Sequence, residues 1–397
     1  MALRRIAIVS GSYLCAALLW LIVGGPPRSA AAEIPEPVRQ ALEANARSLN
    51  PITIAWERTR TSDLPRPRAL TIVGDETSSF FLPNKSRFMW DNGRFYVQTV
   101  HLSRLATDPT DASPNKTLSD VAFDGQKRYA LTKFHENRSD PLVIIDTPTT
   151  LSILSPRSRF LEADFFYETG FHFPERAEDY IAKRPAIISL PLYLIEQGAR
   201  VIEVGREEVD GVSCTALVLR SETAGYRFLL DPMKNYAVRR RVETSPSGEV
   251  ARRAHCSDFT RLPGSGLWMP RKVEVGWHTW LKALPKPVKE AVVRETYLVS
   301  EIKSEPIPPA QFVLKDFKPS TVVSDGTIEG KKGSSGRVSY IIPADPGRLD
   351  EVINAAASGK SYEPSIVSFR RKFILANVLL ILILIGVVWW RVGRKSR

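Results

Sequence analysis

The chain has 397 residues and a formal net charge of +12, and its sequence pI of about 9.6 raises the question of nucleic-acid binding. Residues 1–32 carry three arginines and no acid, and residues 370–397 carry seven basic residues and no acid, which leaves about +2 for residues 33–369. Basic runs such as Arg239 to Arg241 are more often a solvated strand face than a phosphate site, so we exclude nucleic acid as a partner.

The first 32 residues have the order of a secretory signal peptide. Arg4 and Arg5 precede an apolar run over residues 6–25, and the small residues Ala30, Ala31 and Ala32 follow it. We predict cleavage after Ala32, although a core this long could instead stay in the membrane as an uncleaved anchor. Cleavage places residue 33 outside the cytoplasmic membrane.

The exported part begins with a helical pattern and then changes to strands. Apolar residues recur at helical spacing over residues 36–49, and Pro51 bars continuation of that helix. From residue 52 the pattern alternates with a period of two. Turn residues divide it into two hairpins, one around Asn92-Gly93 and one around Asp124-Gly125.

Residues that face each other in a hairpin share a face of the sheet, so the apolar pattern predicts the register. A two-residue turn at Asn92-Gly93 pairs Trp90 with Phe95 and Phe88 with Val97. This register gathers the four side chains on one apolar face.

In the second hairpin a two-residue turn would set apolar side chains against Gln126 and Arg128. A three-residue loop over residues 124–126 instead sets Val121 against Tyr129, and we predict that loop.

A helical stretch follows over about residues 174–197, interrupted near Pro185 and Pro191 and ended by Gly198. Seven strands then follow in succession, joined by hairpin-like turns with no helix-length link, which predicts an antiparallel sheet. Their expected ranges are 201–209, 212–220, 226–230, 236–243, 249–259, 269–277 and 292–303.

Beyond the strands, the residues from 305 to 346 are rich in proline, glycine, serine and lysine, and a short helical pattern covers residues 349–357. Residues 373–390 are apolar except for Asn377, and at about 1.5 Å per residue they approach the roughly 30 Å thickness of a bilayer core. We predict a transmembrane helix here.

These patterns divide the chain into five parts. They are a signal peptide (1–32), an extracytoplasmic β domain (33–345), a juxtamembrane stalk (346–371), a transmembrane helix (372–390) and a cytoplasmic tail (391–397). The protein is thus expected to be a single-pass protein of the cell membrane, with its globular part in the periplasm.

Cys214 and Cys256 remain after cleavage of the signal peptide. In an in-order meander two strands lie between them, so their backbones are about 14 Å apart at roughly 4.8 Å per strand, beyond the reach of a disulfide. We expect two buried thiols.

The search for catalytic motifs is negative. The sequence has no GxSxG, HExxH, CxxC, Walker-type or GxGxxG string, and its five histidines are scattered singly. We therefore expect no enzyme, no metal and no cofactor. A hydrolase whose site is assembled from distant residues stays open as an alternative.

A family resemblance is carried by hairpins with Asp-Gly turns and by residues 207–219, 226–232, 236–240, 259, 266–270 and 307–322. These segments resemble the C-terminal half of the LolA-like superfamily, which includes the periplasmic lipoprotein carrier and the RseB sensor. It covers roughly residues 36–325. It implies an incomplete β-barrel wrapped around helices, whose apolar interior shelters acyl chains in the carriers. Two departures, the predicted anchor and proline-rich insertions such as residues 284–287, put shuttling between membranes in doubt.

The sequence therefore predicts an α+β protein in which a strongly curved antiparallel sheet, an incomplete β-barrel, packs on a few helices, with one C-terminal transmembrane helix. We expect its apolar hollow to bind a lipid or an acylated protein through Phe88, Trp90, Phe95 and Val97. On this view Trp90→Ala stays folded but loses an apolar ligand, while Arg239→Ala serves as a surface control. The alternative is an RseB-like envelope sensor that binds another envelope protein and transports no ligand.

Overall fold

The computed structural model describes residues 32–61, 83–103, 115–133, 141–154, 164–182, 185–278, 291–315, 317–330 and 336–360. Nearly all of the predicted signal peptide and the whole predicted transmembrane helix lie outside these residues. Within the described part of the chain, no helix combines the length and the apolar character needed to cross a membrane.

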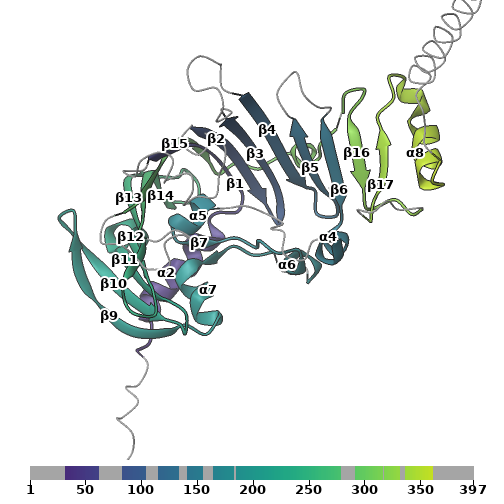
Figure 1. Ribbon diagram of the computed structural model, residues 1–397. Helices are drawn as coiled ribbons and strands as arrows, with labels where there is room; N and C mark the ends of the chain where they lie inside the picture. Colours follow the sequence, from purple (N-terminus) through teal and green to yellow (C-terminus); the bar gives the residue numbers. More distant parts are fainter. Residues whose placement is uncertain are drawn as a thin grey trace, which may run out of the picture.

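One large sheet dominates the described structure and curves over a set of short helices (Figure 1). Its fifteen strands follow the order β17-β16-β6-β5-β4-β3-β2-β1-β15-β14-β13-β12-β11-β10-β9. All neighbouring pairs are antiparallel except β6 and β16. The expected mostly antiparallel sheet with few helices is confirmed, and the parallel pair departs from it.

The first half of the sheet follows helix α2 (Glu36–Arg47), whose apolar residues Val38, Ala41 and Leu42 are buried. The helix prediction is confirmed, with an end two residues earlier than expected. The strands of this half are β1 (Ile52–Thr61), β2 (Asn84–Asp91), β3 (Arg94–Ser103), β4 (Asn115–Phe123), β5 (Arg128–Lys133) and β6 (Leu142–Asp146).

Short elements between the two halves of the sheet lie on its concave side (Figure 1). They are α4 (Pro148–Leu154), α5 (Asp164–Glu168), β7 (Phe171–His172), α6 (Ala177–Ile181), β8 (Ile188–Ser189) and α7 (Leu190–Glu196). The predicted helical stretch thus contains α6 and α7 but also β8, and both α4 and α5 come before it.

The second half is an in-order meander, as predicted. Its strands are β9 (Arg200–Val209), β10 (Val212–Arg220), β11 (Gly225–Asp231), β12 (Ala237–Thr244), β13 (Val250–Arg261), β14 (Trp268–Trp277) and β15 (Val293–Lys303). A short 3-10 turn, η2 (Pro232–Lys234), joins β11 to β12. Cys214 on β10 and Cys256 on β13 are buried free thiols, which confirms the expectation of no disulfide between them.

The two halves of the sheet join where β15 pairs with β1. Residues about 240 positions apart in sequence, such as Arg58 and Tyr297, are cross-strand partners there. After β15 come η4 (Pro309–Phe312), β16 (Val322–Asp325), β17 (Val338–Ile341), η5 (Pro346–Arg348) and α8 (Leu349–Ala357). The segment rich in proline, glycine, serine and lysine therefore adds two strands to the sheet.

A buried ion pair holds this extension to the sheet. Arg337 Nε donates to Asp146 Oδ1 at 2.8 Å, and Arg337 Nη2 donates to Asp146 Oδ2 at 2.9 Å. The two residues are separated by 191 positions in sequence. Such a bidentate pair fixes both groups, since each buried charge would be costly without the other.

The two hairpins test the predicted registers. In the first, Trp90 faces Phe95 and Phe88 faces Val97, as predicted. In the second, Val121 faces Ala130 rather than Tyr129, so the predicted three-residue loop is wrong.

The loop has four residues because the side chain of Asp124 accepts hydrogen bonds from the backbone N–H groups of Gln126 and Lys127 at 2.8 and 2.7 Å. An aspartate that bonds to its own loop in this way sets loop length independently of the apolar pattern. The extra residue moves Tyr129 to the other face of the sheet.

Candidate functional site

The concave face of β1 to β5 carries side chains whose polarity changes in rows across the strands. Because successive side chains alternate between faces, the register brings Phe88, Val97, Val121 and Ala130 into one row. The next row contains Trp56, Ser86, Thr99 and Ser119. One face thus passes from apolar to hydroxyl-bearing side chains within a single step along the strands.

The apolar end of this face is filled by the chain itself. Phe88 is 0% exposed and Trp90 is 1% exposed. The ring of Phe173 lies 5.2 Å from the ring centres of both, and Phe166 lies 4.8 Å from that of Phe88. Phe95 is also fully buried, with Tyr180 of α6 at 6.0 Å. These three predicted ligand-binding residues therefore form a packed aromatic core in this structure.

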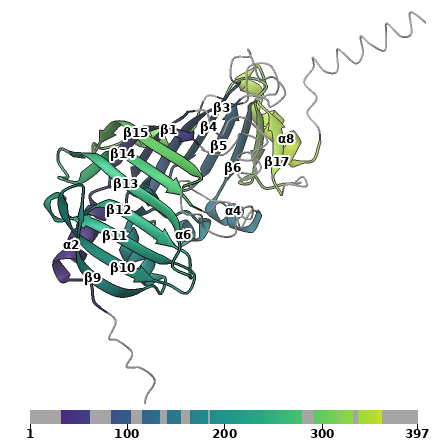
Figure 2. The ribbon, with the colours of Figure 1, turned by 60° about the vertical axis from the view of Figure 1, so that its left-hand side comes forward.

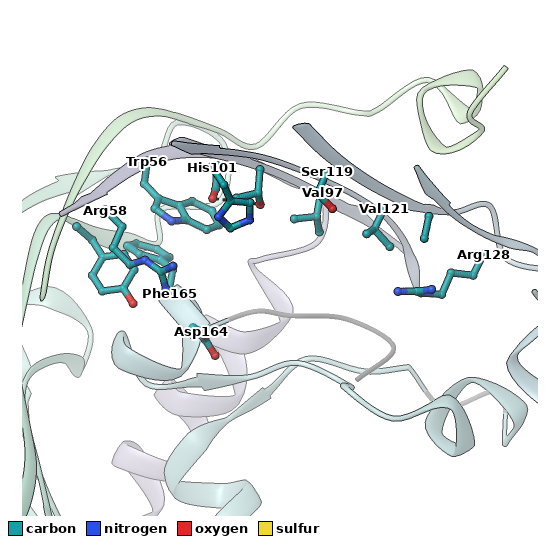
Figure 3. Close-up of a pocket in the computed structure, with 13 residues that line it drawn as sticks. Trp56, Arg58, Val97, His101, Ser119, Val121, Arg128, Asp164 and Phe165 are labelled. Carbon is teal, nitrogen blue, oxygen red and sulfur yellow. Dashed lines mark hydrogen bonds between the residues drawn. The ribbon is translucent and has the colours of Figure 1, made fainter. Parts of the chain in front are cut away.

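Val97, the fourth predicted residue, lies beside a cavity of about 290 Å³. Figure 3 shows Trp56, Val97 and Val121 on the sheet side of this cavity, with Asp164 of α5 on the other side. Val97 thus borders open space, whereas its neighbours Phe88, Trp90 and Phe95 are covered by the chain itself. Contact of any of the four with a ligand stays a prediction.

The polar end of the cavity carries the arginine Arg58 and also the carboxylate of Asp164, which is close enough to raise the pKa of Arg58. Arg58 on β1 lines it beside Tyr297 on β15, and His101 lines it from β3. Burial alone would lower the pKa of Arg58, but Tyr297 and Glu295 hold that pKa above its ordinary value. Burial and then the charges of Arg58 and Arg60 lower the pKa of His101. Arg58 is thus charged, while His101 is held towards its neutral form.

A buried carboxylate stabilises this end of the cavity. Glu295 accepts hydrogen bonds from Trp277 Nε1 at 3.2 Å and from Tyr297 Oη at 3.3 Å, and it forms a short ion pair with Arg60. Burial, followed by the charge of Glu295, raises the pKa of Tyr297. Tyr297 therefore stays a neutral hydroxyl beside the cavity.

Sequence reasoning missed the hydroxyl-bearing and basic members of this site. The available signal was the same period of two, since Ser86 precedes Phe88 by two residues, and Thr99 and His101 follow Val97 on the same face. Arg58 could not be assigned in this way, because its partner Tyr297 belongs to a strand far away in the sequence.

The basic run Arg239 to Arg241 is largely buried, which corrects its interpretation as a solvated face. A bulge in the pairing of β11 and β12 leaves Arg239 out of the ladder, and its Nη2 donates to the buried Asp231 at 2.7 Å. Arg241 is 1% exposed and binds the buried Glu168 of α5 at 2.5 Å. Arg239 is therefore no surface control. Paired charges of this kind are structural.

Among the described residues, no group of three or more His, Cys, Asp and Glu side chains is arranged to hold a metal ion. The buried thiols also lack the surroundings of a reactive cysteine. Burial raises the pKa of Cys256 to about 12 and raises that of Cys214, which keeps both protonated at neutral pH.

No family model matches the chain, and no curated protein matches it. Solved structures with a similar fold include a DUF1329 family protein from Desulfovibrio piger, with a TM-score of 0.37 and 11% identity over 70% of this chain and 98% of that one. A LolA superfamily protein from Nitrosomonas europaea has a TM-score of 0.35 and 10% identity over 71% of this chain and 99% of that one. An outer membrane lipoprotein-sorting protein domain from Vibrio parahaemolyticus has a TM-score of 0.35 and 9% identity over 67% of this chain and 90% of that one.

Two of these three structures are described as LolA superfamily or lipoprotein-sorting proteins, the group that the sequence segments resemble. TM-scores and identities this low carry no argument about this chain.

Proposed function

We propose that this protein is an extracytoplasmic module of the cell envelope, held by a C-terminal transmembrane helix, that binds an apolar ligand under its curved sheet. The observation that supports this proposal is the cavity beside Val97, in which the apolar side chains of Val97 and Val121 are followed along the strands by hydroxyl-bearing side chains and Arg58, with Arg128 beyond the apolar ones. A ligand with an apolar chain and a polar end matches that order.

The size of the cavity limits what it holds. At about 290 Å³ it lies just below the range of small-molecule pockets, about 300–1,000 Å³. It therefore accommodates part of one apolar chain, with the polar end towards Arg58, and the remainder of a lipid or acylated protein stays outside. In this proposal, the chain's own side chains fill part of the space under the curved sheet, and the ligand occupies the rest.

The second candidate is an envelope sensor that binds another protein and transports no ligand. The observation that favours it is the packing of Phe166, Phe173 and Tyr180 against the residues expected to face a ligand. A filled hollow is what a scaffold for protein recognition requires, because its core has no need of free space.

Photolabelling distinguishes the two candidates. Membranes that contain the full-length chain would be incubated with a fatty acid carrying a diazirine group, irradiated, and the labelled peptides mapped by mass spectrometry. We expect label on the strand residues around Val97 and Val121. Filling the cavity with Val97→Trp should remove that label, because the added ring occupies the space of the chain.

Val100 provides the matched control. It lies three residues further along β3, on the other face of the sheet, where it is paired with Lys85, so Val100→Trp adds the same ring without filling the cavity. Label that persists in Val97→Trp, or that is lost equally in both variants, would contradict ligand binding in this cavity and leave the sensor candidate.

A further inference from the structure

The outer face of β9 to β13, on the side away from the helices, carries a groove unrelated to the cavity of the proposed function. Alternation along β11 separates the two faces. Phe228 and Leu230 are buried in the core formed with α2 and α7, whereas Arg227 and Leu229 line the groove on the opposite face. This half of the sheet is in the foreground of Figure 2, with α2 behind it.

The groove has a volume of about 590 Å³, and its lining alternates between apolar and basic side chains. The register produces this pattern. Val218 pairs with Arg227, Arg227 with Val242, and Val242 with Arg253, so consecutive strands present apolar and cationic groups in turn. Leu229 and Arg240 form the neighbouring row.

The charge of the groove is unbalanced. Its lining holds four arginines, Arg220, Arg227, Arg240 and Arg253, and one carboxylate, Glu207. That carboxylate is already bound by Arg227 at 2.5 Å. Arg240 also lies 3.8 Å from Asp210, so Arg220 and Arg253 are the two lining arginines that form no ion pair among the described residues, and they attract a carboxylate-bearing partner.

The groove also offers apolar side chains to a partner, in addition to its charged ones. Ile202, at one end of the groove, is 56% exposed, and Leu229 is 1% exposed at its floor. Recessed apolar groups flanked by arginines are typical of protein interfaces, where an aliphatic or aromatic anchor enters a pocket and arginine binds beside it.

From this combination we infer that the outer groove is a docking site for an acidic, partly apolar segment of another polypeptide, in which carboxylate and apolar side chains alternate. A protein segment matches the groove better than a bilayer, because the apolar floor is recessed and Glu207 lies among the arginines.

The test uses the full-length chain in detergent micelles and fluorescence anisotropy. The probes are a fluorescein-labelled peptide of alternating Asp and Leu, and peptides of equal length with Lys in place of Asp or Ser in place of Leu. We expect the Asp/Leu peptide to bind at least about tenfold more tightly than either, a difference of about 1.4 kcal/mol, and its affinity to fall as salt is added.

Two variants test the groove itself. Arg240→Gln with Arg253→Gln should weaken the Asp/Leu peptide at least about tenfold, and the exposed Arg253→Gln alone should weaken it severalfold if the double variant does not fold. Arg271→Gln is the matched control, since it removes one exposed arginine of β14 outside the groove.

Three outcomes would overturn the inference. The Lys/Leu peptide could bind as well as the Asp/Leu peptide, or binding could be insensitive to the arginines of the groove. In the third outcome, vesicles of anionic phosphatidylglycerol bind in an Arg253-dependent way while no peptide does, which would make the groove a membrane contact. Loss of fatty-acid labelling beside Val97 would leave the inference untouched, because the cavity is on the other face of the sheet.

Discussion

Replacing Trp90 by alanine tests whether the aromatic core under the sheet is close-packed. Trp90 is almost fully buried, and its ring meets Phe173 edge-to-face, with 88° between the ring planes. Burying roughly 150–250 Å² of an aromatic side chain at about 25 cal/mol per Å² contributes about 4–6 kcal/mol. This is an upper limit, because the unfolded chain already buries part of that surface. Buried aromatic residues replaced by alanine cost about 3–5 kcal/mol, and we expect the free energy of unfolding to fall by that amount.

The measurement is pulse proteolysis of the full-length chain in detergent micelles over a series of urea concentrations. Trp268→Ala is the control, since Trp268 is only partly buried at the start of β14, with Lys234 Nζ 5.5 Å from its ring. Its loss of stability should be clearly smaller. A loss below about 1 kcal/mol for Trp90→Ala, within the range of ordinary substitutions, together with lost fatty-acid labelling, would refute the packing argument and return Trp90 to the ligand site.

Four further outcomes follow from buried groups and from the predicted topology. Cys214 and Cys256 should react with a maleimide only after denaturation and without reductant; a need for reductant, seen by mass spectrometry, would contradict free thiols. Arg337→Ala should destabilise β16 and β17 by about 3–5 kcal/mol, measured as faster amide exchange there than in β12. Burial lowers the pKa of His172 from 6.5 to about 4, so the stability that its neutral form provides is present above pH 6.5 and falls as the pH drops towards 4. His172→Phe should flatten this profile in pulse proteolysis, and an unchanged profile would exclude His172 as its cause. Protease added outside spheroplasts should digest residues 33–369 and leave a small C-terminal fragment; protection would reverse the topology.

The sequence by itself determined the parts of the fold that depend on neighbouring residues. Helix α2 follows from apolar spacing and from Pro51, and the meander of β9 to β15 follows from alternation and short turns. The register of Trp90 with Phe95 follows from the Asn92-Gly93 turn, since both glycine and asparagine adopt the positive φ that this turn needs. Each of these features depends on backbone and turn preferences acting over a few residues.

The sequence predicted only part of the candidate site, because local preferences place residues on a face but do not show what packs against it. The pattern placed Phe88, Trp90, Phe95 and Val97 on one face, which the register confirms. It could not show which of the four would be covered, because that depends on where the segment with Phe166 and Phe173 packs.

Only the tertiary structure decided which contacts form between residues distant in sequence. Arg58 meets Tyr297, β16 pairs with β6, and Arg241 meets Glu168 because packing selects one arrangement out of many that satisfy the local pattern. Buried charges illustrate the reason most directly. An arginine on a strand has the same local pattern whether it faces water or a carboxylate, and the cost of burying it unpaired is what selects the fold in which both charges meet.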